Sequence, residues 1–291
     1  MKKKKIIIFG GSGFLASNLA DELSKKKYRV TIFDNRRSKY IKNNQKMIIG
    51  NILDTSKVLN ACKNQDVIYH FAAVADIKEA NKKHLNAIKI NIYGTVNILE
   101  AAIKSGVKRI IFASSIYAIS QQGGFYSTSK LSSEMIIERY SEKYPLKYTI
   151  LRFGSLYGPR SNKFNPIKNF IIQALKEKKI TRFSDGKEIR SYIHVNDLKK
   201  ICVKVLKRKF ENKYINIIGG KALTVRKIIN VIKNIIPKTK VIFKNKKMIY
   251  NYKKNPFTYK IRKGKTLKLK NEVKLELGIN SLINEISKNK K

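Results

Sequence analysis

The chain has 291 residues, of which 43% are apolar, and its formal net charge is +45 at pH 7. This length and composition allow a substantial buried core, in one large domain or two closely joined ones, and exclude disorder as the default state. The lysines before Ile6–Phe9 resemble the start of a secretory signal, but Gly10 ends the apolar stretch too early for one. Because a membrane span takes about 20 apolar residues and we find no such segment, we expect a soluble, cytoplasmic protein.

Two features of the composition bear on metal and nucleic-acid binding. Cys62 and Cys202 have no second cysteine or histidine at metal-ligand spacing, so we expect two buried thiols and no metal site. The positive charge would suit nucleic acid or an anionic membrane. However, only 12 of the 64 basic residues are arginine, and the lysines run from Lys2 to Lys291 amid abundant Ile and Asn. Nucleic-acid sites usually gather arginine and aromatic residues in one patch, so we expect no specific nucleic-acid binding.

The first half of the chain alternates two hydrophobic patterns. Runs rich in Ile, Val and Phe predict six strands, at Lys5–Phe9, Arg29–Phe33, Lys46–Ile49, Val67–Phe71, Arg109–Ala113 and Tyr148–Arg152. Between them, apolar residues at helical spacing predict helices that include Leu15–Leu23, Ala87–Ile103 and Leu131–Tyr144. Parallel strands need crossovers of a dozen or more residues, which these helices supply. We therefore predict an α/β fold with a doubly wound, parallel Rossmann sheet.

After Arg152 the pattern changes, because glycines and prolines divide the chain into shorter elements. We predict a Rossmann domain at residues 1–158, with a returning segment at 189–219, and a smaller C-terminal lobe made of 159–188 and 220–291. Apolar clusters predict that the lysine-rich tail is folded as well. These clusters lie at 241–243, 248–250 and 275–286.

A glycine-rich segment from Gly10 to Ala16 follows the first predicted strand and opens the first helix. Glycines there let the backbone turn sharply and approach a pyrophosphate, whose charge the helix N-terminus stabilises. Asp34 ends the second strand, where a carboxylate accepts hydrogen bonds from the adenosine ribose and repels a 2′-phosphate. The two features together predict a dinucleotide site that prefers NAD to NADP, a preference that Arg36 and Arg37 soften.

A tyrosine and a lysine four residues apart are candidates for acid–base chemistry. The chain contains three such pairs: Tyr126/Lys130, Tyr250/Lys254 and Tyr259/Lys263. Because the chain is rich in both residue types, the spacing alone means little. Tyr126 stands just after the fifth predicted strand, at the sheet edge where ligands of open α/β folds bind, and follows Ser114 and Ser115. Position in the fold therefore selects Tyr126 and Lys130.

These segments occur in the order found in the extended short-chain dehydrogenases/reductases of the NAD-dependent nucleotide-sugar epimerase/dehydratase type, which the chain resembles. The matching segments are Gly10–Ala16, Asp34, His70–Ala73, Asn91–Thr95, Ser114–Ser115 and Tyr126/Lys130. The resemblance continues through Leu151–Arg160, Ile189–Asp197 and Tyr214–Leu223. An ordered set of this kind is far more specific than any single motif.

The resemblance implies a role for each matching residue. Tyr126 is the expected acid/base, Lys130 lowers its pKa and holds the nicotinamide ribose, and Ser115 hydrogen-bonds the reacting oxygen. A phenol with a pKa near ~10 is a poor base at neutral pH, and a nearby ammonium favours its ionised form. The NAD-binding residues that the resemblance implies are Gly10, Gly13, Phe14, Leu15, Asp34, Asn35, Asn51, Ile52, Phe71, Ala72, Ala73, Asn91, Tyr126 and Lys130. The substrate-binding residues are Tyr117, Ser155 and Arg190, whose planar guanidinium suits a diphosphate.

The chain departs from the family pattern in three places. The short segment Gln121–Gly124 stands where many relatives have a longer loop that shapes the substrate pocket. Asn51 occupies the place of an aspartate that commonly contacts the adenine, and Ser155 stands where asparagine is frequent. Neither change removes hydrogen-bonding capacity. These departures bear on substrate and cofactor geometry more than on the class of reaction.

Ile116 and Tyr117 stand where the related sugar 4,6-dehydratases carry an acidic pair. Elimination of water therefore lacks its proton donor, and decarboxylases, which usually place a glutamate nearby, are disfavoured similarly. We expect an NAD-dependent nucleotide-sugar epimerase, namely a 4-epimerase of a UDP-sugar that acts through a transient keto intermediate. Two alternatives stay open: a nucleotide-sugar reductase or dehydrogenase, and a non-catalytic dinucleotide-sensing or polyanion-binding protein on the same fold.

The resemblance also implies a homodimer. The predicted helices near Ala87–Ile103 and Tyr126–Tyr144 carry apolar residues on more than one face, and a two-fold pair of them would form a four-helix contact. The charge of +45 on each chain opposes this association at low salt. We interpret His70 and His194 as structural, and His84 has no context that suggests a role.

Overall fold

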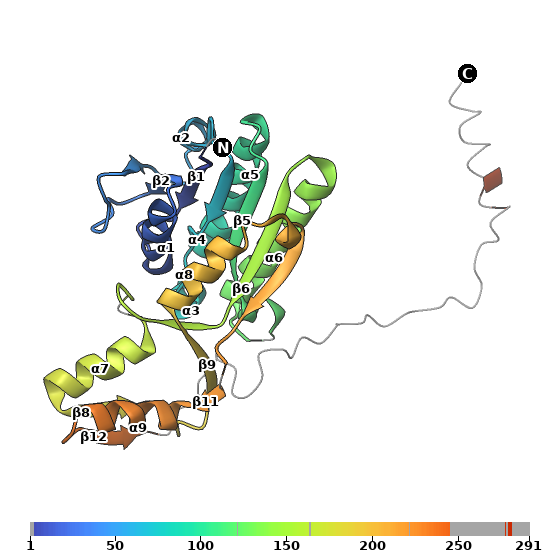
Figure 1. Cartoon of the computed structure of the whole chain (residues 1–291). Coiled ribbons are helices and arrows are strands. Elements are labelled where there is room, and N and C mark those ends of the chain that lie inside the picture. Colours follow the sequence, from blue (N-terminus) through green and yellow to red (C-terminus); the bar gives the residue numbers. More distant parts are fainter. Residues whose placement is uncertain are drawn as a thin grey trace. The chain divides into compact units, whose positions relative to one another are not determined.

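The computed structural model describes residues 3–120, 122–162, 164–220 and 222–244, together with 277, 279 and 280. The chain divides into two units, Met1–Tyr259 and Lys260–Lys291. Every element described below belongs to the first unit (Figure 1).

A seven-stranded sheet forms the centre of this unit (Figure 1). In spatial order its strands are β10 (Lys213–Ile217), β6 (Lys147–Phe153), β5 (Arg109–Ser115), β4 (Val67–His70), β1 (Lys5–Phe9), β2 (Arg29–Asp34) and β3 (Gln45–Ile49). Every neighbouring pair is parallel, and the chain winds outwards from β1 in both directions. The predicted α/β, doubly wound fold is confirmed. Each of the six predicted strands forms, with small differences at the ends.

Helices cover both faces of the sheet. On one face lie α1 (Phe14–Lys25) and α8 (Val195–Lys204); on the other lie α2 (Thr55–Cys62), α5 (Gly94–Lys104) and α6 (Phe125–Lys143). Side chains alternate along β1, so that Ile6 and Ile8 pack with the first pair of helices, and Ile7 and Phe9 with the other three. All four side chains are fully buried, as expected for a strand covered on both faces.

The predicted helices have somewhat different limits in the structure. The stretch Ala87–Ile103 consists of α4 (His84–Ile88), a π-helical segment η1 (Lys89–Tyr93) and α5, and the short α3 (Ile77–Lys82) precedes it. α6 begins at Phe125, before the apolar pattern at Leu131 and next to Tyr126, where the helix of the expected dimer contact begins, so that Tyr126 and Lys130 lie on it. Its first turns are polar, and an apolar pattern alone cannot show where such a helix starts.

After β6 the chain forms two smaller sheets. β7 (Ser155–Tyr157), β9 (Ile189–His194) and β11 (Ala222–Thr224) make a three-stranded sheet, and β8 (Lys179–Arg182) pairs with β12 (Lys240–Phe243). α7 (Pro166–Glu177) and α9 (Val225–Ile235) enclose a small core with them, around Phe170, Ile180 and Ile229. Of the predicted returning segment, β10 joins the central sheet and α8 covers it, whereas β9 belongs to the three-stranded sheet.

The division into a Rossmann domain at residues 1–158, with 189–219, and a C-terminal lobe at 159–188 and 220–291 stays a prediction. In the tail, the cluster at 241–243 forms part of β12, while 248–250 and most of 275–286 lie outside the described residues. Cys62 and Cys202 are buried and unpaired, as predicted, and burial raises the pKa of the Cys62 thiol to about 12. None of the helices in the described ranges has the length and apolar character that a membrane span requires.

Candidate active site

The carboxyl ends of β1, β2, β4 and β5 meet at one edge of the central sheet, because all its strands are parallel. Gly10 follows β1, Asp34 ends β2, Phe71 follows β4 and Ser115 ends β5. The fold therefore brings to one edge residues that are far apart in the sequence.

Gly10 and Gly13 shape the loop between β1 and α1. Gly10 has φ +75°, and a Cβ atom there would lie 2.5 Å from the backbone nitrogen of Ala72, so the position requires glycine. Gly13 is the N-cap of α1 and provides no side-chain cap for the helix, whose first residues are Phe14 and Leu15. An uncapped helix N-terminus behind a glycine turn can receive a phosphate group. This loop therefore fits the pyrophosphate of a dinucleotide.

Asp34 lies beside the glycine-rich loop. Its carboxylate accepts hydrogen bonds from the backbone N–H groups of Ser12 in that loop (3.0 Å) and of Arg36 (3.2 Å), which follows Asn35 in the chain. The Ser12 hydroxyl donates to the Arg36 carbonyl at 2.8 Å. These contacts hold a half-buried carboxylate next to the predicted pyrophosphate position, where a ribose would lie. The residues present therefore fit NAD.

The remaining residues predicted to contact the adenine side and the nicotinamide side follow β3 and β4. Asn51 is exposed and accepts from the N–H of Leu53 at 3.0 Å, while Ile52 is buried. Phe71 donates its N–H to Phe9 at 2.8 Å, which sets Ala72 and Ala73 against the glycine-rich loop. Their contacts with NAD stay predictions.

Asn91, in the π-helical segment, connects three parts of the site. Its side-chain oxygen accepts from the N–H of Val74 at 2.8 Å, and its amide nitrogen donates to the Val74 carbonyl and, at 2.9 Å, to the Ser129 hydroxyl. The side chain is fully buried. Because Val74 follows β4 and Ser129 lies on α6, Asn91 fixes the distance between the two predicted walls of the nicotinamide site.

Ser115, Tyr126 and Lys130 come together where β5 meets α6, and all three are buried. Burial raises the pKa of Tyr126 above its ordinary value of 10.0, and a hydrogen bond with the Ser115 side chain acts in the opposite direction. The serine hydroxyl and the phenol are therefore neighbours, as their predicted roles require.

Lys130 lies one helical turn beyond Tyr126, on the same face of α6. Its ammonium donates to the carbonyl of Ala113 at 2.8 Å and lies 4.7 Å from the centre of the Phe112 ring. Burial lowers the pKa of Lys130 to about 8, and the charge of Glu134 limits the decrease. The predicted lowering of the Tyr126 pKa by Lys130 is not among the causes of the tyrosine's shift, because the ammonium is directed at the backbone of β5.

Glu134 is a buried residue of the site that the sequence analysis missed. Its carboxylate is 1% exposed and accepts from Arg152 Nη2 (2.6 Å), Arg152 Nε (3.0 Å) and the Ser114 hydroxyl (2.5 Å). This pair fastens α6 to β6 and to the end of β5, next to Ser115. The spacing of four residues between Tyr126, Lys130 and Glu134 was the signal available in the sequence.

Asn81, also missed, fastens the turn that leads into α6. Its Nδ2 donates to the carbonyls of Ile77 (2.7 Å) and Gly123 (2.9 Å), and its Oδ1 accepts from the N–H of Phe125 at 3.1 Å. Gly124 has φ +58°, and a Cβ atom there would collide with the Asn81 side chain. The short glycine turn that replaces the family's longer loop is thus set against α3. This contact fixes where α6 begins, and with it the position of Tyr126.

The three histidines make local contacts. His70 Nε2 lies 2.9 Å from the hydroxyl of Thr95, which itself donates to the Asn91 carbonyl at 2.6 Å. Since that hydroxyl has one proton, Nε2 must carry the proton of a neutral imidazole. Burial, with the charge of Lys130, lowers the pKa of His70 to about 3. His84 stacks on a phenylalanine of α6 and His194 caps α8.

The three predicted substrate residues come from separate elements. Tyr117, in the 3-10 helix η2 (Ile116–Ile119), lies edge-on to Tyr126 with 6.4 Å between the ring centres. Ser155 begins β7, and Arg190 is a buried residue of the neighbouring β9. The structure thus places Tyr117 beside Tyr126, and it places Ser155 and Arg190 in one small sheet. Their contacts with a substrate stay predictions. Within the described ranges, no group of His, Cys, Asp and Glu is arranged to hold a metal ion.

The site combines a buried serine, tyrosine and lysine with a glycine-rich loop that fits a dinucleotide. This arrangement is that of a short-chain dehydrogenase/reductase, an enzyme class that moves hydride to and from a nicotinamide. The chain belongs to the NAD dependent epimerase/dehydratase family, whose model matches residues 6–218. NAD is the cofactor of this family, and the chain is an enzyme of the nucleotide-sugar epimerase/dehydratase kind.

Several relatives and solved structures are similar to the chain. The UDP-N-acetyl-alpha-D-glucosaminuronate decarboxylase of Bacillus cytotoxicus is 34% identical over 74% of this chain and 75% of its own length. A Methanocaldococcus jannaschii protein, provisionally named as a UDP-glucose 4-epimerase, is 29% identical over 98% of this chain and 99% of its own. The crystal structure of Thermotoga maritima UDP-glucose 4-epimerase with UDP-glucose has a TM-score of 0.80, 26% identity, and covers 88% of this chain and 90% of that one.

Proposed function

We propose that the protein is a 4-epimerase of a UDP-sugar, which acts through a transient keto intermediate. The observation that carries the proposal is the buried set of Ser115, Tyr126 and Lys130. Directly after Ser115, the chain has Ile116 and Tyr117 where a dehydratase would carry acidic residues. A protein named as an epimerase also matches the chain over nearly its whole length.

Tyr126 performs the proton transfer in this proposal. The phenolate accepts the proton of the sugar 4-hydroxyl, while Ser115 hydrogen-bonds the same oxygen and holds it in place. When bound, NAD would supply the acceptor for the hydride of C4 and the donor for its return. Before the hydride returns, the ketone turns so that its other face is attacked. Tyr126 then gives the proton back to the oxygen. Every bond broken in the first half is formed again in the second, so the sugar is isomerised without net oxidation.

Lys130 contributes a positive charge at the site. With a pKa of about 8 it is largely protonated at neutral pH, in spite of its burial. A cation near the phenol favours the phenolate and opposes the effect of burial on the Tyr126 pKa. We propose that Lys130 acts in this way once its ammonium is partly turned from the Ala113 carbonyl, to which it now donates.

The glycine-rich loop and Asp34 would hold the pyrophosphate and adenosine ribose of NAD. On the substrate side, Tyr117 would contact the sugar next to Tyr126. Arg190 and Ser155 would bind the nucleotide part. These assignments agree with the proposed division of the chain into a Rossmann domain and a substrate-binding lobe.

Decarboxylation is the second candidate, because a relative 34% identical to the chain is named as a UDP-sugar acid decarboxylase. Oxidation of C4 in a sugar acid produces a β-keto acid, which loses CO2 and leaves a shorter ketone. The same three side chains can serve this first oxidation. Among the acidic residues of α6, Glu134 comes first after Tyr126 and Lys130 in the chain. It is held by Arg152, so it does not act as a proton donor.

We further propose a homodimer formed through α4, η1 and α6. Large apolar side chains are exposed on these elements, with exposed fractions of 74% for Leu85, 52% for Tyr93 and 57% for Met135. Exposed apolar side chains grouped on packed helices are typical of an interface. A two-fold axis there would bring the same helices of both chains together.

A substrate panel tests the function directly. The purified protein with NAD is incubated with UDP-, GDP- and dTDP-hexoses and with UDP-hexuronic acids, and products are followed by NMR and NADH by absorbance. The proposal predicts 4-epimers of a UDP-hexose without CO2 release or lasting NADH. Release of CO2 from a sugar acid alone would favour the decarboxylase, and steady net production of NADH would favour a dehydrogenase.

A further inference from the structure

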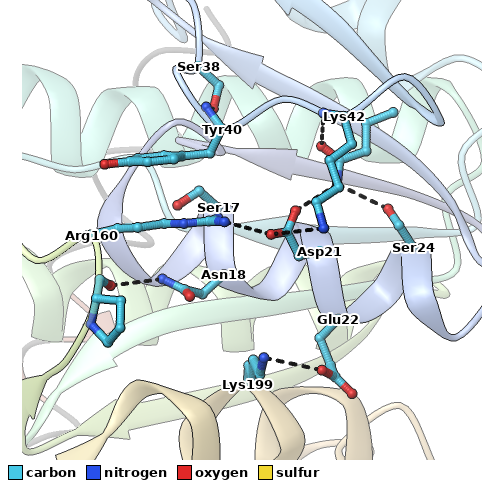
Figure 2. A network of polar contacts seen from close by, with 12 residues as sticks. Ser17, Asn18, Asp21, Glu22, Ser24, Ser38, Tyr40, Lys42, Arg160 and Lys199 are labelled. Atoms are coloured by element: carbon cyan, nitrogen blue, oxygen red, sulfur yellow. Dashed lines mark hydrogen bonds and ion pairs between the residues drawn. The ribbon is translucent and has the colours of Figure 1, made fainter.

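A turn at Gly158–Arg160, which leads from β7 to α7, is fastened to α1 at two points (Figure 2). Asn18 Nδ2 donates to the carbonyl of Pro159 at 3.2 Å. Three residues further along the same face of α1, Asp21 accepts from Arg160 Nη2 at 2.7 Å. The start of the smaller sheets is thereby tied to the helix that follows the glycine-rich loop.

The same two residues of α1 also hold the cofactor side of the site. Asn18 Nδ2 donates to the carbonyl of Phe14, the first residue of α1, at 2.9 Å. Asp21 is shared with the segment that follows Asp34, since it lies 3.4 Å from Lys42 Nζ and accepts from Gln45 Nε2 at 3.2 Å. One cluster therefore connects the predicted pyrophosphate loop, the predicted adenosine segment and the turn.

Arg160 completes the connection at some conformational cost. Its backbone φ is +69°, a left-handed conformation that residues other than glycine rarely adopt. Its guanidinium lies 4.3 Å from the ring centre of Tyr40, in the segment after Asp34, and so joins that segment to the turn (Figure 2). Its Nη1 is buried and has no hydrogen-bond partner among the described residues. A strained residue persists where its surroundings hold it in place, and such residues gather at functional sites.

We propose that Arg160 is a positioning residue that latches the start of the substrate-binding part onto the cofactor-binding helix, so that NAD retention and sugar-nucleotide affinity are coupled. The inference rests on the proposed function. An epimerase returns hydride to the sugar from which it was taken, so NAD must stay bound between the two halves of each cycle. A latch that joins both binding parts retains the cofactor while substrate is present.

The chain offers a matched control for this latch. Glu22, the neighbour of Asp21 on α1, forms an ion pair of 3.4 Å with Lys199 of α8, away from the turn (Figure 2). The side chains of Glu22 and Lys199 are 14% and 22% exposed, respectively. These fractions are close to those of Asp21 and Arg160, which are 16% and 21%. Lys199→Gln therefore removes an ion pair of similar burial from the same helix without loosening the latch.

The experiment measures NAD release by stopped flow and UDP affinity by calorimetry, with and without NAD. Arg160→Gln and Asp21→Asn should each speed NAD release by about tenfold and remove most of the dependence of UDP affinity on NAD. The double variant should show clearly less than the sum of the two single effects, because both substitutions remove the same contact between Arg160 and Asp21. Lys199→Gln should stay within about twofold of the parent protein.

The latch is refuted if Arg160→Gln releases NAD at the parent rate, if the two single effects add fully, or if Lys199→Gln matches them. Tyr40→Leu removes the partly exposed ring beneath the guanidinium, and it serves as the test if Arg160→Gln does not fold. It should speed NAD release, and an unchanged rate would refute the latch. These readouts need no turnover, so an unchanged release rate in a protein that epimerises refutes the latch alone. Faster release in a protein that epimerises nothing refutes the proposed function alone.

Discussion

Removal of the charge of Glu134 should both destabilise the protein and change its pH dependence. Glu134 is 1% exposed and Arg152, its partner, has a side chain that is 16% exposed. Glu134→Gln keeps the shape and one acceptor oxygen but leaves the guanidinium without a counter-charge. Breaking a buried ion pair by removing one partner costs about 3–5 kcal/mol. We expect the lower end of that range, about 3 kcal/mol, because Arg152 keeps some solvent and one hydrogen bond.

The same substitution acts on Lys130. The charge of Glu134 raises the pKa of Lys130, whereas burial lowers it to about 8. Without that charge the pKa falls further, so the lysine loses its proton at a lower pH. If protonated Lys130 is needed for turnover, the alkaline limb of the pH–rate profile moves towards lower pH. His70 also faces the charge of Lys130, but its own imidazole is neutral because its pKa is about 3.

Glu142→Gln on the same helix is the matched control. Glu142 is 53% exposed and forms a 2.7 Å surface ion pair with Arg139, so its loss should cost about 0–1 kcal/mol. Urea unfolding followed by circular dichroism gives both free energies, and initial rates between about pH 6 and 9.5 give the profile. Equal losses of stability in the two variants, or an alkaline limb that stays in place in Glu134→Gln, would refute this reasoning.

Three further predictions follow from single features of the structure. NAD should bind more tightly than NADP by calorimetry, because Asp34 would face the 2′-phosphate, and Asp34→Asn should narrow the difference; equal affinities in the parent protein would contradict the assignment. The folded-state pKa of His70, about 3, lies below its ordinary 6.5, so its stabilising effect is complete above pH 6.5 and is lost at roughly 1.4 kcal/mol per unit as the pH falls towards 3. Unfolding free energies of His70→Gln should therefore vary less over this range, and an unchanged slope would refute the neutral imidazole. Light scattering should show a dimer that strengthens with salt and dissociates in Met135→Lys; a monomer at physiological salt would contradict the proposed interface.

The strands of the central sheet could be predicted because each is buried on both faces. A strand such as Ile6–Phe9 is apolar at every position, and that pattern is visible without knowledge of its neighbours. The start of α6 could not be found in this way, since Ser127, Thr128 and Ser129 give no apolar period. What fixes it is Asn81, a residue 44 positions before Phe125 in the sequence.

The composition of the candidate site was only partly visible in the sequence for a similar reason. Gly10, Asp34 and Tyr126 carry signals in their local positions, namely a turn, a strand end and the edge after β5. The partners of Glu134 and Arg160 lie on other elements, so their ion pairs depend on how the chain packs. Local patterns identify which residues can react, whereas the residues that hold them appear only in three dimensions.

The central claim is that one hydride leaves the sugar and returns to the same carbon while Tyr126 carries the proton. The most direct measurement uses the UDP-hexose selected by the panel, labelled with deuterium on C4, in ordinary water with NAD. The account predicts that NMR and mass spectrometry find both 4-epimers with the deuterium retained on C4, and that Tyr126→Phe, while still binding NAD, forms no epimer. Loss of the label from C4, or epimer formed by Tyr126→Phe at the parent rate, would contradict it.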